Sequence, residues 1–177
     1  MTLVLLTGGA RSGKSSLAVA LAARDGADVV FLATGEARDD EMAARIARHR
    51  AERPAHWTTI EEPVRVAEAI AATDPTACLV VDCLSLWVAN LLEQHDAAAI
   101  ERAGDAAARR ATDRAGTTIA VTNEVGLGVV PATAVGRAYR DVLGRVNATW
   151  AERATEAYLV VAGRLLPLLH ATEVLDR

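Results

Sequence analysis

The sequence predicts an α/β fold, in which helices cover both faces of a mostly parallel β-sheet. The first reason is that short apolar runs with the length of buried strands alternate with longer helical segments. The second is that a glycine-rich turn separates the first apolar run from the first helix. A chain of 177 residues suits one domain with a substantial core, so residues 1–177 are predicted to form a single unit.

The predicted elements alternate along the whole chain. The strands are expected at residues 3–6, 28–33, 57–60, 79–82, 117–122 and 157–162, with a last one at 165–169. The helices are expected at 15–24, 39–53, from Pro63 onward, up to Leu92, at 97–115 and at 135–156. The helix at 39–53 has acidic residues in its first turn and basic ones in its last, and Pro54 must end it. Pro63 suits the first position of a helix.

The glycine-rich turn matches the phosphate-loop pattern G-x-x-x-x-G-K-[ST] at every fixed position. Its residues are Gly8, Gly9, Ala10, Arg11, Ser12, Gly13, Lys14 and Ser15. Lys14 is the only lysine among the 19 lysines and arginines. A compact ammonium reaches between the β- and γ-phosphates, where a broad guanidinium fits poorly. The sequence therefore predicts a P-loop NTPase-type three-layer sandwich that binds a nucleoside triphosphate, with Lys14 as a catalytic group.

Asp82 closes an apolar strand, where P-loop proteins place the carboxylate that holds Mg²⁺. Ser15 offers a hydroxyl to the same ion, so Ser15 and Asp82 are the predicted metal ligands. The alternative is that Asp82 only marks the end of a strand. Ligands of parallel sheets collect at the carboxyl ends of the strands. The loops expected to converge on one site follow Thr7, Ala33, Asp82 and Thr122.

The helix at 39–53 carries His49 in a cluster of arginines. These are Arg45, Arg48, Arg50 and Arg53. Neighbouring positive charge favours a neutral imidazole, whose ring nitrogen is then a nucleophile or an acceptor. The guanidinium groups also suit phosphate oxygens. The alternative is a solvated helix face without catalytic function.

The ordered set of motifs resembles the bifunctional adenosylcobinamide kinase/adenosylcobinamide-phosphate guanylyltransferase family. The matching segments are residues 8–15, 33–34, 39–46, 49–50, 53–61, 82–91, 122–131 and 144–147. They cover nearly the whole chain except the alanine-rich stretch after Gln94 and the C-terminal tail. Many kinases and ATPases share the first motif, whereas the ordered set is specific.

The resemblance implies an enzyme of cobalamin biosynthesis with two reactions. The first phosphorylates the aminopropanol hydroxyl of adenosylcobinamide, and the second transfers GMP from GTP to that phosphate, giving adenosylcobinamide-GDP. A GMP-histidine intermediate is implied at His49, and His56 is interpreted as structural. GTP and ATP are the implied substrates with Mg²⁺, and a homotrimer is the implied assembly.

The resemblance also implies a guanine-nucleotide site next to the phosphate loop. The matching residues are Ala33, Thr34, Gly35, Arg50, Ala51, Glu52, Arg53 and Glu61. Glu61 is suited to accept hydrogen bonds from the guanine N1–H and amino group, and the alternative is an ordinary surface glutamate. Residues 122–126 are expected to border the corrinoid. The alternative there is a turn that needs positive φ at Gly126 and Gly128.

Charge, apolar runs and cysteine spacing argue against several other classes of protein and site. A net charge of −4 and a pI near 5.6 argue against nucleic-acid binding. The chain opens without a secretory pattern and has no apolar run that would span a bilayer, so a cytoplasmic location is expected. Cys78 and Cys83 fit neither a redox pair nor a zinc site and are interpreted as reduced core thiols.

Two other functions remain as alternatives. A small-molecule or nucleotide kinase would use the same loop and metal but need no nucleophilic histidine. A GTP-dependent switch or metallochaperone would need an Asn-Lys-x-Asp guanine motif or a cysteine and histidine cluster, and the sequence has neither.

Overall fold

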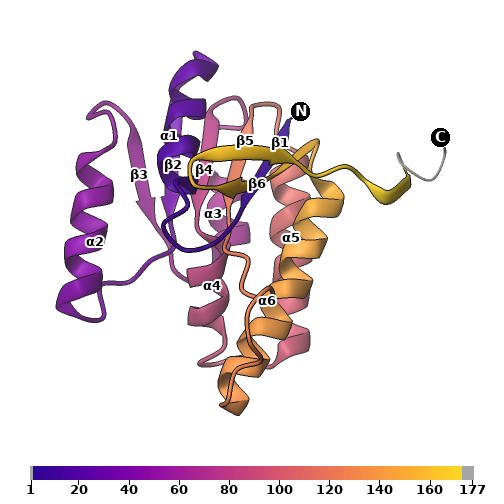
Figure 1. The fold of residues 1–177 in the computed structure, drawn as a ribbon. Helices are drawn as coiled ribbons and strands as arrows, with labels where there is room; N and C mark the ends of the chain where they lie inside the picture. Colours follow the sequence, from indigo (N-terminus) through magenta and orange to yellow (C-terminus); the bar gives the residue numbers. More distant parts are fainter. Residues whose placement is uncertain (1, 173–177) are drawn as a thin grey trace.

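The computed structural model describes residues 2–172 (Figure 1). The strands are β1 (Leu3–Thr7), β2 (Val29–Ala33), β3 (Thr58–Glu61), β4 (Cys78–Asp82), β5 (Thr118–Val121), β6 (Glu156–Val161) and β7 (Arg164–Pro167). The helices are α1 (Lys14–Asp25), α2 (Asp40–Ala51), α3 (Val66–Ala72), α4 (Leu84–Leu91), α5 (Ala97–Thr112) and α6 (Ala134–Arg153). The predicted alternation of strands and helices is therefore confirmed.

The strands form one sheet in the order β3-β2-β4-β5-β1-β6-β7. Every neighbouring pair is parallel except the hairpin of β6 and β7, which is antiparallel. Parallel pairing aligns the carboxyl ends of β1, β2, β4 and β5 along one edge, from which the predicted site loops leave. Within residues 2–172, no helix combines the length and apolar character that crossing a bilayer requires.

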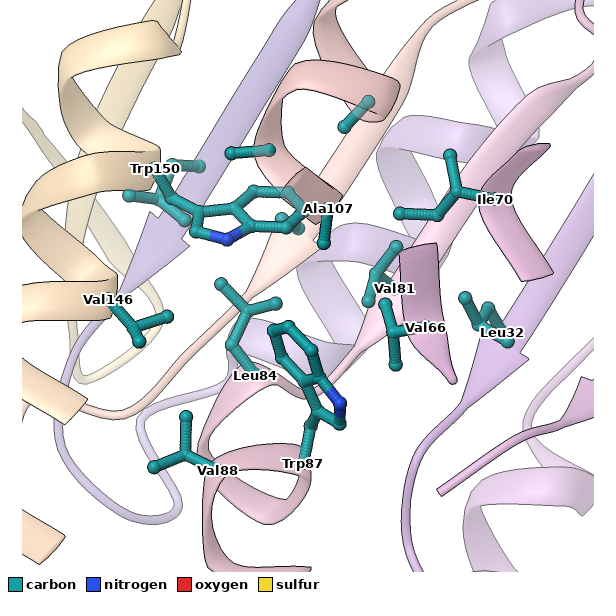
Figure 2. Close-up of a cluster of buried hydrophobic side chains, with 14 of the residues drawn as sticks. Leu32, Val66, Ile70, Val81, Leu84, Trp87, Val88, Ala107, Val146 and Trp150 are labelled. Carbon is teal, nitrogen blue, oxygen red and sulfur yellow. The ribbon is translucent and has the colours of Figure 1, made fainter. Parts of the chain in front are cut away.

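Two apolar layers hold helices against the sheet. On one face, Ala18 and Ala22 of α1 pack against strand residues such as Phe31 and Val80. The other face packs against α3, α4, α5 and α6, and Figure 2 shows part of this layer. Trp87 of α4 and Trp150 of α6 are its largest members. The small side chains of α1 allow a close approach to the sheet, whereas bulky residues fill the second layer.

Helix α2 differs from the other helices because none of its residues is buried. It stands to one side of the sheet, joined to β2 by an irregular segment and to β3 by a curved loop of turns (Figure 1). The helix still has a defined start, since the Asp39 carboxylate accepts a hydrogen bond from the N–H of Met42 at 2.7 Å. The sequence predicted the helix but not its separation from the core.

The prediction that Pro63 opens a helix is wrong, because α3 begins at Val66. Glu62 Oε1 accepts hydrogen bonds from the N–H groups of Val64 and Arg65, at 3.0 and 2.9 Å. These bonds cap the turn, but Arg65 has φ −91° and ψ 55°, outside the helical region, so the helix begins only at Val66.

The alanine-rich helix α5 ends three residues earlier than predicted, at Thr112. Arg114 then lies buried and donates hydrogen bonds to the carbonyls of Asp74 and Ala77, at 2.9 and 2.7 Å. Continuing the helix would compete with this inward position of Arg114. The bonds tie the end of α5 to the turn before β4.

Candidate active site

The phosphate loop connects β1 to α1, and two of its glycines are required by geometry. Gly8 has φ +149°, and a Cβ there would lie 2.3 Å from the carbonyl oxygen of Val160. Gly13 has φ +96° and precedes the first turn of α1. The N–H of Gly163 donates to the carbonyl of Ser12 at 2.8 Å. The loop is thus held against the hairpin of β6 and β7.

Lys14 is buried at the first position of α1. Its ammonium donates to the carbonyls of Gly8 and Gly9, at 2.9 and 2.7 Å. Burial lowers the pKa of Lys14, while the nearby Cys83 and Asp82 act in the opposite direction. The only lysine of the chain therefore points into the curve of the phosphate loop, where its charge would meet phosphate oxygens.

Asp82 ends β4 and lies beside Ser15 at the start of α1. Burial raises the pKa of Asp82, and a hydrogen bond from Ser15 and the charges of His49 and Arg53 oppose that rise. A carboxylate and a hydroxyl are hard oxygen donors, as Mg²⁺ prefers. Within residues 2–172 no cluster of three or more His, Cys, Asp or Glu residues is placed to hold a metal. This pair therefore fits an Mg²⁺ ion whose other ligands are phosphate oxygens and waters.

Helix α2 brings His49 to the phosphate loop. A cavity of about 450 Å³ is lined by the loop, by the ends of β4 and β5, and by one face of α2. The α2 residues on it are Glu41, Ala44, Arg45, Arg48 and His49. Their spacing of three and four residues places them on one side of the helix. The loop residues on it are Arg11 to Ser15 with Ser16, and Asp82 also lines it.

A smaller cavity adjoins the first one and shares His49 and Asp82 with it. The predicted guanine-site residues that line it are Ala33, Gly35, Arg50, Arg53 and Glu61. Arg50 forms an ion pair of 2.5 Å with Glu61, and the guanidinium of Arg53 lies 3.5 Å from the centre of the Phe31 ring. The Nε of Arg53 is buried without a hydrogen-bond partner. Charged donors and an acceptor thus surround a space beside the imidazole.

Other predicted residues lie behind these surfaces. Gly8, Gly9 and Ala10 shape the loop without lining either cavity, and neither Ala51 nor Glu52 lines one. Thr34 is fully buried, and its hydroxyl donates to the Cys83 carbonyl at 2.7 Å and accepts from the Cys83 N–H at 2.9 Å. Thr34 therefore braces the turn after Asp82, and its contact with a nucleotide stays a prediction.

Cys83 and Asn123 also line the large cavity: Cys83 was not a predicted site residue, and Asn123 belongs to the segment 122–126 that was expected to border the corrinoid. Both cysteines are free thiols, as expected: Cys78 is buried, and Cys83 packs against the core with part of its surface on the cavity. The Asn123 amide donates to Ser85 Oγ at 3.1 Å, and its carbonyl accepts from Asn147 at 3.0 Å. A polar residue directly after an apolar strand was the available signal for Asn123.

The site combines a glycine loop between a strand and a helix with a buried lysine and a carboxylate at the end of a strand. These features define a P-loop nucleotide-binding protein. The profile of the cobinamide kinase / cobinamide phosphate guanyltransferase family matches residues 4–168. The chain belongs to this family. The family is one of bifunctional enzymes, so the chain is identified as a kinase and nucleotidyltransferase of cobalamin biosynthesis.

Curated relatives align with this chain over most of their length. The bifunctional adenosylcobalamin biosynthesis protein CobP of Pseudomonas aeruginosa is 45% identical over 165 residues, which covers 93% of this chain and 95% of that protein. The CobU protein of Salmonella typhimurium is 42% identical over 179 residues, covering 91% and 96%. A solved ATPase of a bacterial type III secretion system aligns with a TM-score of 0.55 at 12% identity. It covers 99% of this chain and 53% of that one, and it supports the fold alone.

Asp82→Asn is expected to raise the stability of the nucleotide-free protein at neutral pH. Because burial raises the folded-state pKa above the ordinary value of 3.8, stability falls as pH rises from that value through the raised one. The amide of the variant cannot ionise, so the variant does not lose this stability. We expect its free energy of unfolding to be higher by about 0.5–2 kcal/mol. Urea unfolding without Mg²⁺ would measure it.

The same experiment at lower pH serves as the control. The advantage of Asp82→Asn should shrink as pH falls through the raised pKa and should be smallest below pH 3.8, where the wild-type carboxyl is mostly protonated in both states. A variant that is less stable than the wild type at pH 7 would show that the surrounding cations outweigh burial.

Proposed function

We propose that this protein phosphorylates adenosylcobinamide and then transfers GMP from GTP to the new phosphate through a GMP-histidine intermediate at His49. The observation that carries the proposal is that His49 of α2 lines the same cavity as Lys14 and Ser15 of the phosphate loop. A triphosphate held by the loop would therefore lie next to the imidazole. The product is adenosylcobinamide-GDP.

The transfer is proposed as two displacements. A neutral ring nitrogen of His49 attacks the α-phosphorus of GTP, an N–P bond forms, and the bond to the bridging oxygen breaks to release pyrophosphate. The acceptor phosphate oxygen then attacks the same phosphorus, and the N–P electron pair returns to the imidazole. Lys14 and the loop N–H groups stabilise the charge on the departing pyrophosphate. Mg²⁺, held by Ser15 and Asp82, would supply further charge neutralisation.

The chemistry of Cys83 supports histidine as the covalent carrier. Cys83 is a further potential nucleophile on the cavity, and its Sγ lies 3.0 Å from Ser85 Oγ. Burial raises the pKa of Cys83 to about 11. Because the thiolate is the nucleophilic form, a thiol with this pKa stays unreactive near neutral pH. The imidazole needs no such deprotonation when it is neutral.

The kinase reaction needs no covalent intermediate. Phosphoryl transfer depends mainly on alignment and charge neutralisation, which the phosphate loop and Lys14 provide. Asp82 lies on the same cavity and is placed to orient the acceptor hydroxyl as well as the metal. ATP and GTP are both proposed as substrates, with GTP alone serving GMP transfer.

The smaller cavity is the proposed guanine site. Its position beside His49 and its charged lining suit the base of a nucleotide whose phosphates extend toward Lys14. Glu61 is the proposed acceptor for the guanine N1–H and amino group, an interaction that adenine lacks. Glu61 already pairs with Arg50, so base binding would exchange or share that ion pair. The homotrimer stays a prediction from the family resemblance, and the cytoplasmic location stays a prediction from the sequence.

Labelling with [α-³²P]GTP tests the intermediate. The wild-type protein is expected to retain label after denaturation, in an adduct that acid removes and base does not. Peptide mass spectrometry should locate the added GMP on His49. A protein that phosphorylates cobinamide but acquires no label would fit the alternative of a kinase without a covalent step. Label on any other residue would contradict the assignment of His49.

A further inference from the structure

We propose that residues 125–136, here named the platform loop, bind the corrin ring of the acceptor while its aminopropanol arm reaches into the large cavity. The inference rests on the proposed function for the identity of the acceptor, a corrinoid. It adds a binding surface for that part of the substrate which does not react.

The platform loop has an unusual composition for an exposed segment. It contains no charged residue, although 24% of the chain is charged. Leu127, Val129 and Val130 are 84%, 95% and 60% exposed, and Val135 at the start of α6 is 75% exposed. Clustered exposed apolar side chains mark binding surfaces more often than chance, whereas scattered ones do not. The loop therefore has the character of a surface that another molecule covers.

The position of the loop connects it to the nucleotide cavity. Val121 and Asn123 line the cavity, and the platform loop starts two residues later. In Figure 1 the chain leaves β5 and runs beside α4 to the start of α6, beyond the carboxyl ends of the strands. A ligand whose arm enters the cavity past Asn123 would rest its body on this loop.

Both ends of the loop are fixed in the described structure. At one end, Asn123 is held by Ser85 and Asn147, and Val125 packs against the core. At the other end, the Arg137 guanidinium donates to the carbonyls of Pro131 and Ala132, at 3.0 and 2.8 Å. The apolar side chains between these anchors stay exposed. A surface held in this way loses less conformational entropy when a ligand binds.

The alternative interpretation of this segment, a turn with positive φ at Gly126 and Gly128, is wrong, because neither glycine has a positive φ. A Cβ at Gly128 would meet no atom within 4 Å. These glycines therefore do not serve a strained turn. The lack of a side chain at Gly128 leaves the backbone between Leu127 and Val129 uncovered, where amide groups of a ligand can hydrogen-bond. The Gly126 N–H, in contrast, already donates to Glu124 Oε1 at 2.6 Å.

The size and chemistry of a corrinoid match the loop. Ligand pockets of roughly 300–1,000 Å³ hold drug-sized molecules, and the cavity of about 450 Å³ must already accept a nucleotide. A corrin ring therefore has to lie outside it. The rim of the ring carries methyl groups and uncharged amides, which suit apolar side chains and open backbone groups. A second copy of this chain is the other occupant that an apolar surface admits.

The test uses the double variant Leu127→Ser/Val129→Ser in the full-length protein. Cobinamide binding is measured by equilibrium dialysis without nucleotide, and the kinase reaction gives KM for cobinamide and for the nucleotide. The variant is expected to raise the cobinamide Kd and KM about 10-fold or more, which corresponds to about 1.4 kcal/mol or more. The nucleotide KM and the labelling with [α-³²P]GTP should not change.

The matched control is Leu166→Ser/Leu169→Ser, which removes two side chains that are each 57% exposed on another surface. It is expected to leave cobinamide binding unchanged. Unchanged cobinamide Kd in the Leu127→Ser/Val129→Ser variant would overturn the proposal. A lower molecular mass of that variant by light scattering would also overturn it, because the loop would then be a contact between copies. Absence of GMP label from the wild type would refute the His49 intermediate without affecting the dialysis result.

Discussion

His49→Ala is expected to lower GMP transfer by about 10³-fold or more while leaving phosphorylation of cobinamide within a few-fold of the wild type. Removing the covalent nucleophile eliminates the intermediate itself, so no slower version of the same step remains. The kinase step keeps its phosphate loop, Lys14 and Asp82. Mass analysis of products formed from cobinamide, ATP and GTP would measure both reactions together. The expected product of the variant is cobinamide phosphate that accumulates without GMP.

The fold offers a good setting for this experiment. His49 lies on α2, which has no buried residue, so the substitution is not expected to unfold the protein. His56→Ala is the matched control, since His56 is exposed and lines neither cavity. It should retain both activities. Equal loss of both reactions in His49→Ala, with an unchanged melting temperature, would contradict a role confined to GMP transfer.

Local patterns in the sequence explain the part of the fold that was predicted. The central strands of the sheet are buried, so they appear as short continuous apolar runs such as residues 78–81. The phosphate loop was also recognisable locally, because its fixed glycine and lysine positions fall within eight consecutive residues, although the close approach of Val160 to Gly8 involves a distant segment. Asp82 was predicted because parallel strands present their carboxyl ends to the ligand.

The structural features that the sequence did not predict depend mainly on contacts between residues that are far apart in the chain. The hydroxyl of Thr34 bonds to the backbone of Cys83, 49 positions away, so no spacing pattern indicated its structural role. The start of α3 was misplaced because the backbone of Arg65 is not helical, which the local pattern after Pro63 did not indicate. The inward position of Arg114 depends on carbonyls from a different segment.

Helix α2 shows both what local sequence patterns predict and what they miss. Its helical pattern and its Asp39 cap were readable from the sequence, since both are local. The distance of α2 from the core could not be predicted, because an exposed helix and a helix over a cavity have the same polar composition. Only the structure places His49 on the cavity of the phosphate loop.

Lys14→Ala is expected to lower both reactions by about 10²–10³-fold. The ammonium lies 2.9 and 2.7 Å from the carbonyls of Gly8 and Gly9, inside the loop that would hold the phosphates. Both the γ-phosphoryl transfer and the release of pyrophosphate build negative charge there, so one substitution should impair both. Initial rates of kinase and GMP transfer, with binding of a fluorescent GTP analogue, would measure the effect.

Lys14→Arg separates charge from shape at the same position. The charge is kept, but the planar guanidinium is broader than the ammonium and does not fit between carbonyls that are this close. We therefore expect Lys14→Arg to recover less than about a tenth of the lost activity, whereas a purely electrostatic role would restore most of it. Wild-type rates in either Lys14 variant would show that the phosphates bind elsewhere. One shared nucleotide site with a separate covalent carrier requires a specific pattern. The Lys14 variants should lose both reactions, whereas His49→Ala should lose GMP transfer alone.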